Sequence, residues 1–187
     1  PILLIVCLSG TIANASLTLD DEKKLGQEFY DKLLESGTII QDPRISPYLQ
    51  RLGEEVLTPG RRVPFDFKFS VIDSAAVNAF ATPGGYVYVN RGLINLVDKE
   101  SELAGVLAHE IAHVNQRHIA DIIDKGKKIN IAALAAVLAG AFLGAGSDLS
   151  GAAIGFSMAA ATSLSLKYSR EHEEEADRLG MSYMAAA

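Results

Sequence analysis

The feature that most restricts the fold of this chain is a pair of histidines four residues apart, His109 and His113, in the run His-Glu-Ile-Ala-His. Apolar residues around the run recur with the period of a helix, at Leu103, Val106, Leu107, Ile111 and Val114. Side chains four positions apart project from nearly the same face of a helix, so two imidazoles there can bind one zinc ion. Glu110 is rotated by about 100° from His109, beside the position of a water on such an ion. The run therefore predicts a metal-binding helix with Glu110 as the catalytic base; the alternative is a pair of ordinary surface or core histidines.

A catalytic zinc site also needs a third protein ligand and one open position for water. His172 lies in the acidic run 171–177, which has five acids in seven residues. Such a run is most often a solvated helix face, and spacing alone does not select a ligand from it. His118 follows His113 by five residues, a rotation of about 140° on a continuous helix, so we expect it to be a surface or packing residue.

Composition narrows the class of protein. The chain has 187 residues, enough for one domain with a substantial core. Hydrophobic residues make up 49% and charged residues 21%, a balance that argues against disorder. The formal net charge is -6 and no basic stripe is present to neutralise phosphates, which argues against a nucleic-acid partner.

The first residues are typical of an export signal. An apolar run at 2–8 is followed by a small-x-small pattern at 13–15, which predicts that 1–15 is part of a signal peptide. A buried N-terminal strand is the alternative. Lipidation of Cys7 is less favoured, because Val6 stands where a small residue would be expected. Cleavage would remove the only cysteine and leave an exported protein without disulfides.

Periodicity and turn residues predict an α+β fold, a small antiparallel sheet with the HExxH helix and flanking helices. Helices are expected over 18–35, from Ser46 to Val56 and from Ser101 to Gly126, and strands over 64–73, 77–81 and 86–90. The first of these strands alternates apolar and polar residues, which predicts that only one of its faces is buried.

The histidine motif, together with Ser-Arg-Glu-His-Glu-Glu-Glu-Ala-Asp at 169–177, resembles the HtpX-like and BepA-like zinc metallopeptidases, family forty-eight of the metallopeptidases, of the gluzincin type. Residues 78–80, 83–89 and 102–108 are also similar to that family, so the resemblance runs from about Phe65 to the C-terminus. It implies a zincin-like fold with one Zn²⁺ per chain. It also implies a metallopeptidase domain over 16–187, which in the family usually continues further.

The resemblance assigns roles to individual residues. It implies Glu173 as the third metal ligand beside His109 and His113, with the other glutamates of the run solvated and His172 not a ligand. Asp177, one turn beyond Glu173, is expected to orient a ligating histidine or else to have a plain surface or capping role. In zincin folds an exposed strand beside the metal helix pairs with an extended substrate. The expected substrate-binding strand is Tyr86, Val87, Tyr88, Val89 and Asn90. The alternative is that this is an ordinary internal strand.

These features predict a zinc-dependent metalloendopeptidase of the periplasm or cell envelope, acting on protein substrates such as misfolded or stalled envelope proteins. Glu110 would accept a proton from the attacking water and pass it to the leaving amine. One alternative is a zinc-holding chaperone or binding module of the outer-membrane assembly machinery. The other is a membrane-integrated metallopeptidase.

The second alternative depends on residues 129–166, which are uncharged except for Asp148. The two uncharged runs have 19 and 18 residues, long enough to span a bilayer. They are rich in alanine and contain few strongly apolar residues, so their insertion would be marginal. We expect a buried or lid-like helical hairpin near the active site, with membrane contact as the alternative.

Overall fold

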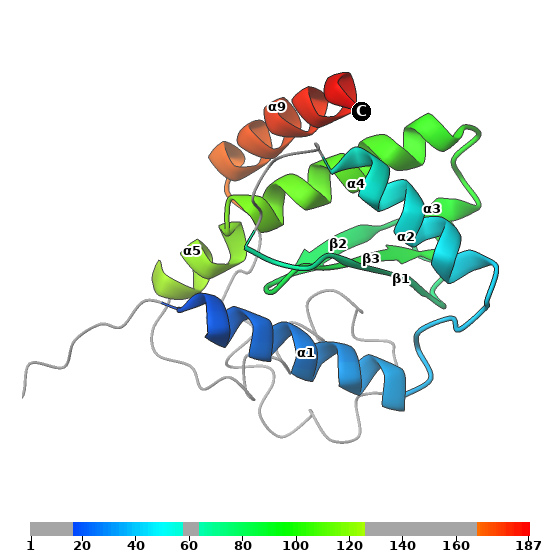
Figure 1. Ribbon diagram of the computed structural model, residues 1–187, viewed down its shortest axis with the longest axis horizontal. Coiled ribbons are helices and arrows are strands. Elements are labelled where there is room, and N and C mark those ends of the chain that lie inside the picture. The colour runs from blue at the N-terminus through cyan, green and yellow to red at the C-terminus, as the bar shows by residue number, and fades with distance from the viewer. Residues whose placement is uncertain (1–16, 58–63, 126–167) are drawn as a thin grey trace, which may run out of the picture.

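A three-stranded sheet has helices on both faces, with α1 (Leu19–Glu35) below it and α2 (Ile45–Val56) and α4 (Glu100–Asn115) above it in Figure 1. The computed structural model describes residues 17–57, 64–125 and 168–187. The other elements are β1 (Lys68–Ile72), β2 (Ala79–Thr82), β3 (Tyr86–Asn90), α3 (Arg91–Ile94), α5 (His118–Lys125) and α9 (Arg170–Ala186). The predicted α+β class is confirmed.

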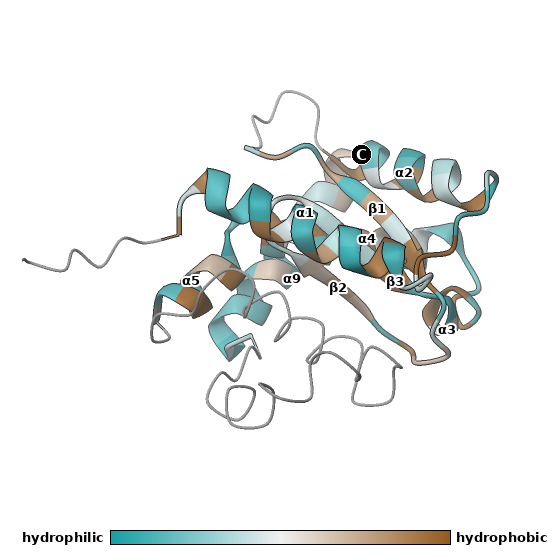
Figure 2. Ribbon diagram, turned by 90° about the horizontal axis from the view of Figure 1, so that it is seen from below, coloured by the Kyte–Doolittle hydropathy of each residue, from teal (hydrophilic) through white to brown (hydrophobic). Residues whose placement is uncertain are grey.

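The sheet separates two apolar clusters. One lies against α1 and contains Leu25, Phe29, Leu33, Ile72, Phe80 and Tyr88. The other lies against α2, α4 and α9 and includes Phe69, Val71, Val87, Val89, Leu107 and Ile111. Because both faces are covered, β1 is buried on both sides from Phe69 onward, and Ser70 is only 5% exposed. The expectation of a half-buried first strand is therefore wrong. Figure 2 shows the hydrophilic residues of α1 on its outer side, away from the sheet.

The sheet is mixed, not antiparallel as expected. Its order is β1-β3-β2, with β3 parallel to β1 and antiparallel to β2. The hairpin between β2 and β3 turns at Gly84 and Gly85, whose φ angles of 86° and 99° favour glycine. The returning strand of this hairpin inserts beside β1, which runs in the same direction, so one of its two neighbours is parallel.

This order corrects the prediction that Tyr86–Asn90 is an exposed strand that pairs with substrate. β3 is the central strand, and both of its hydrogen-bonding edges are occupied by β1 and β2. The outer edge of β1 is also covered, since Gln50 accepts a hydrogen bond from the Phe69 N–H and Ile40 N–H donates to the Val71 carbonyl. No strand among the described residues pairs with the outer edge of β2. Among the described residues, that edge is the one without a neighbouring strand, although Phe80, Ala81 and Thr82 on it are buried.

The first helix forms as its sequence predicts. Thr18 is its N-cap in a capping box with Asp21, and acidic residues fill its first turn. Its apolar stripe, Leu25, Phe29 and Leu33, is fully buried against the sheet. α2 begins at Ile45, one residue before the predicted cap at Ser46.

The long helix expected from Ser101 to Gly126 is two helices. α4 ends at Asn115, and α5 begins at His118. Between them Arg117 has a φ of 56°, in the left-handed region that an arginine seldom adopts. Its guanidinium donates hydrogen bonds to the buried Glu22 carboxylate and to the Leu17 carbonyl of the N-terminal region, both at 2.6 Å. These contacts offset the strain of the turn, although burial still raises the pKa of Glu22.

α9 packs along α4, side by side in Figure 1 and in contact through the second apolar cluster. Gly180 stands where the two helices are closest. A Cβ at that position would lie 3.1 Å from the His109 nitrogen and 3.2 Å from the Ala108 carbonyl carbon. The absence of a side chain at Gly180 therefore sets the distance between the helices.

Two expectations concern residues outside the described part of the chain: the signal peptide at 1–15 and the hairpin or membrane contact at 129–166. Among the described residues, no helix combines the length and apolarity needed to cross a bilayer.

Replacing Gly180 by valine should lower the free energy of unfolding by about 1–3 kcal/mol, because the added atoms overpack the α4–α9 contact. Gly105 is a matched control, since it also lies within a helix but a Cβ there would meet nothing within 4 Å. Gly105→Val should be close to neutral in urea unfolding. Equal losses for the two variants would contradict this account of the helix contact.

Candidate metal centre

Three side chains from two helices converge on one point. His109 and His113 come from α4 and Glu173 from the first turn of α9. The two Nε2 atoms lie 2.9 Å apart, and Glu173 Oε2 lies 3.2 Å from that of His109 and 3.9 Å from that of His113. Ligands of a tetrahedral zinc ion are separated by roughly 3.3–3.5 Å at usual bond lengths. Two imidazoles and a carboxylate at these separations fit a zinc ion, and the structure brings the three predicted ligands together.

The orientation of His109 suits metal binding. Its Nδ1 lies 2.8 Å from Asp177 Oδ1, one turn along α9 from Glu173. A carboxylate at Nδ1 favours a proton on that nitrogen, which leaves the Nε2 lone pair facing His113 and Glu173. The side chain of Asp177 is 75% exposed, so Asp177 is a surface residue that also contacts His109.

Glu110 lies beside these residues without being one of them. It is 7% exposed, and its Oε2 has no hydrogen-bond partner among the described residues. Burial and then the neighbouring Glu173 raise the pKa of Glu110 to about 8, while a hydrogen bond from the Ala81 backbone opposes this rise. A divalent cation would have the opposite effect on Glu110 and favour its anion. The Ala81 contact also places Glu110 next to the edge of β2 that no described strand pairs with.

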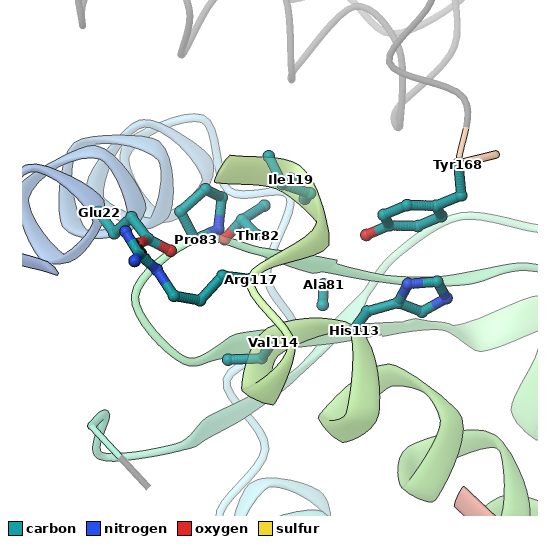
Figure 3. A pocket seen from close by; sticks show the side chains of 9 residues that line it. All are labelled: Glu22, Ala81, Thr82, Pro83, His113, Val114, Arg117, Ile119 and Tyr168. Atoms are coloured by element: carbon teal, nitrogen blue, oxygen red, sulfur yellow. Dashed lines mark hydrogen bonds and ion pairs between the residues drawn. The ribbon is translucent and has the colours of Figure 1, made fainter. Parts of the chain in front are cut away.

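His113 is buried on all sides. Burial, and then the neighbouring His109, lower the pKa of His113 to about 3, so its imidazole is neutral at pH 7, as a metal ligand must be. The ring of Tyr168 stacks on it, with centroids 3.7 Å apart. Figure 3 shows Tyr168 and His113 on one side of a small pocket and Glu22 and Arg117 on the other. The Tyr168 hydroxyl is buried, and no residue in the described part of the chain forms a hydrogen bond with it.

The sequence reasoning missed two residues next to the centre. His118 is 2% exposed, and its Nδ1 lies 2.8 Å from Nδ1 of His113. Glu175, expected to be solvated, lies 3.1 Å from His118 Nε2. His172 is not part of the converging set, since its Nε2 contacts Asp121. The expected 140° rotation of His118 assumed a continuous helix, and no local signal marked the left-handed turn at Arg117.

Comparisons with known proteins agree with this geometry. Residues 43–187 match "Peptidase family M48". The chain is 34% identical over 173 residues to the beta-barrel assembly-enhancing protease of Yersinia pestis and 32% identical over 173 residues to that of Escherichia coli. Each alignment covers 92% of this chain and 36% of the relative. The mitochondrial metalloendopeptidase OMA1 of Schizosaccharomyces pombe is 33% identical over 175 residues, which is 91% of this chain and 49% of that protein.

The chain therefore spans between about a third and a half of the length of these relatives. The match to the family covers most of this chain, including both helices of the candidate metal centre. This chain belongs to peptidase family M48.

Proposed function

We propose that this chain is the catalytic domain of a zinc-dependent metalloendopeptidase that hydrolyses peptide bonds of envelope proteins. The observation that carries the proposal is the convergence of His109, His113 and Glu173 beside a buried glutamate, Glu110, that is not one of the three. A site with three protein ligands and an adjacent base has the composition of a catalytic zinc site.

Each residue of the candidate site has a separate proposed role. His109, His113 and Glu173 hold the metal, and Asp177 keeps His109 in orientation. When bound, zinc supplies a Lewis acid for the peptide carbonyl. Glu110 accepts the proton of the attacking water and returns it to the leaving amine, a role that suits a carboxylate with one unpartnered oxygen.

An extended peptide is proposed to bind along the outer edge of β2 by β-strand addition. The edge is not paired with another described strand, and the Ala81 backbone on it contacts Glu110. A peptide on this edge would therefore pass beside the proposed base. An edge strand next to the metal helix also supports the zincin-like assignment.

The names of the relatives support a place for this protein in the cell envelope. Two of them are called beta-barrel assembly-enhancing proteases. We propose a periplasmic location, with misfolded or stalled envelope proteins as substrates and contact with the outer-membrane assembly machinery. The same names favour a second candidate, a zinc-holding module that assists assembly without cleaving peptides.

Glu110→Gln decides between the two candidates. The variant should retain its zinc and lose about 10²–10⁴-fold in kcat/KM on an unstructured protein substrate, because it lacks the proton acceptor. Glu174→Ala is the control, since Glu174 is an exposed acid paired with Arg170. Full activity of zinc-loaded Glu110→Gln would refute the peptidase mechanism, and absence of activity in the zinc-loaded wild type would favour the assembly module.

Zinc should stabilise the folded chain. At a concentration about 100 times the Kd, zinc should raise the free energy of unfolding by about 2.7 kcal/mol, because it binds the folded state. A chelator should reverse this gain, and Glu173→Ala should abolish most of it. Thermal unfolding with and without zinc measures the effect, and Glu174→Ala should behave like the wild type. An equal response of Glu173→Ala and the wild type would remove Glu173 from the ligand set.

Asp177→Ala should weaken zinc binding by about 10–100-fold, because His109 loses the group that fixes its tautomer and ring orientation. Competition with a chromophoric chelator measures the Kd. Glu174→Ala, on the same helix, should leave it unchanged. If Asp177→Ala bound zinc like the wild type, the plain surface role of Asp177 would be the correct one.

A further inference from the structure

His118 lies between a proposed metal ligand and a carboxylate. Its Nδ1 is 2.8 Å from Nδ1 of His113, and its Nε2 is 3.1 Å from Glu175 Oε2. We propose that His118 and Glu175 are positioning residues that fix the tautomer and ring orientation of His113. The inference rests on the proposed function, because it concerns the zinc affinity of the same centre.

The first step of the argument is the proton between the two rings. A hydrogen bond between two Nδ1 atoms contains one proton, which belongs to either His113 or His118. If it belongs to His118, neutral His113 carries its proton on Nε2, the atom that faces His109 and Glu173. If it belongs to His113, Nε2 of that ring has a lone pair for the metal. Only the second arrangement leaves the centre ready to bind zinc.

Glu175 selects between these arrangements. As a carboxylate it only accepts hydrogen bonds, so its contact with His118 requires a proton on Nε2 of that ring. Neutral His118 then has a bare Nδ1, which accepts the hydrogen bond from His113 Nδ1–H. Glu175 therefore acts on His113 through an intervening imidazole, whereas Asp177 acts on His109 directly.

The surroundings hold His118 in place. Its side chain is 3% exposed, and its ring stacks on that of His172, with centroids 4.3 Å apart and planes 17° apart. His172 is itself fixed, because its Nε2 lies 3.0 Å from Asp121 Oδ2 of α5. Glu175 also lies 3.7 Å from Arg178 on its own helix. A ring held by stacking on His172 and by contact with Glu175 can orient its neighbour.

The first test compares zinc affinities of the full chain by competition with a chromophoric chelator. His118→Ala and Glu175→Ala should each raise the Kd by about 10–100-fold. His118→Asn should recover part of the loss, since its amide oxygen can accept the hydrogen bond of His113. Glu174→Ala should bind like the wild type. Urea unfolding of the metal-free forms, run in parallel, separates the roles: a merely structural role lowers stability and leaves the Kd of the folded protein unchanged.

The second test is direct and needs no variant. Nitrogen-15 NMR of the imidazoles in the zinc-loaded wild type should show a protonated Nδ1 on His113 and a protonated Nε2 on His118. A protonated Nδ1 on His118 would overturn the proposal, as would an unchanged Kd in folded His118→Ala. These results would leave the proposed function intact, whereas a wild type that binds no zinc would overturn both.

Discussion

The candidate metal centre depends on the close packing of two helices that are far apart in the sequence. α4 alone offers two imidazoles, and the carboxylates that complete the centre come from α9. Gly180 lets the backbones of these helices approach, so the separation of the donor atoms is set by tertiary packing as much as by the histidine motif. A densely packed contact has little freedom to relax, which keeps such a constellation in one geometry.

The acidic residues of α9 make more specific contacts than the composition of the run indicates. Glu173 faces His109 and His113, Asp177 contacts His109, and Glu175 contacts His118. Glu174, by contrast, pairs with Arg170 at the surface. Charge runs are usually solvated faces, but here three histidines lie opposite, of which His113 and His118 are buried. One short segment thereby supplies both a proposed ligand and the groups proposed to orient the other two.

Local patterns predicted much of this architecture, because periodicity and caps act within a few residues. They placed α1, the bounds of β3 and the histidine pair, whereas the third converging donor, Glu173, was implied by the family resemblance and not by spacing. They could not predict the strand order, although the absence of a polar face on β3 was a signal that it is central. Nor could they predict the position of His118, because the turn that re-aims it depends on Arg117 and a partner 95 residues away, Glu22.

Through Glu22, α1 supports the turn next to the candidate metal centre, a role that the sequence of α1 does not indicate. Glu22 is buried in α1 and forms an ion pair with Arg117, in the turn that directs His118 toward His113. Fraying of α1 would move Glu22 away from Arg117 and remove the ion pair that supports this turn. Local opening of α1 should therefore also loosen the turn at Arg117 and, with it, the position of His118.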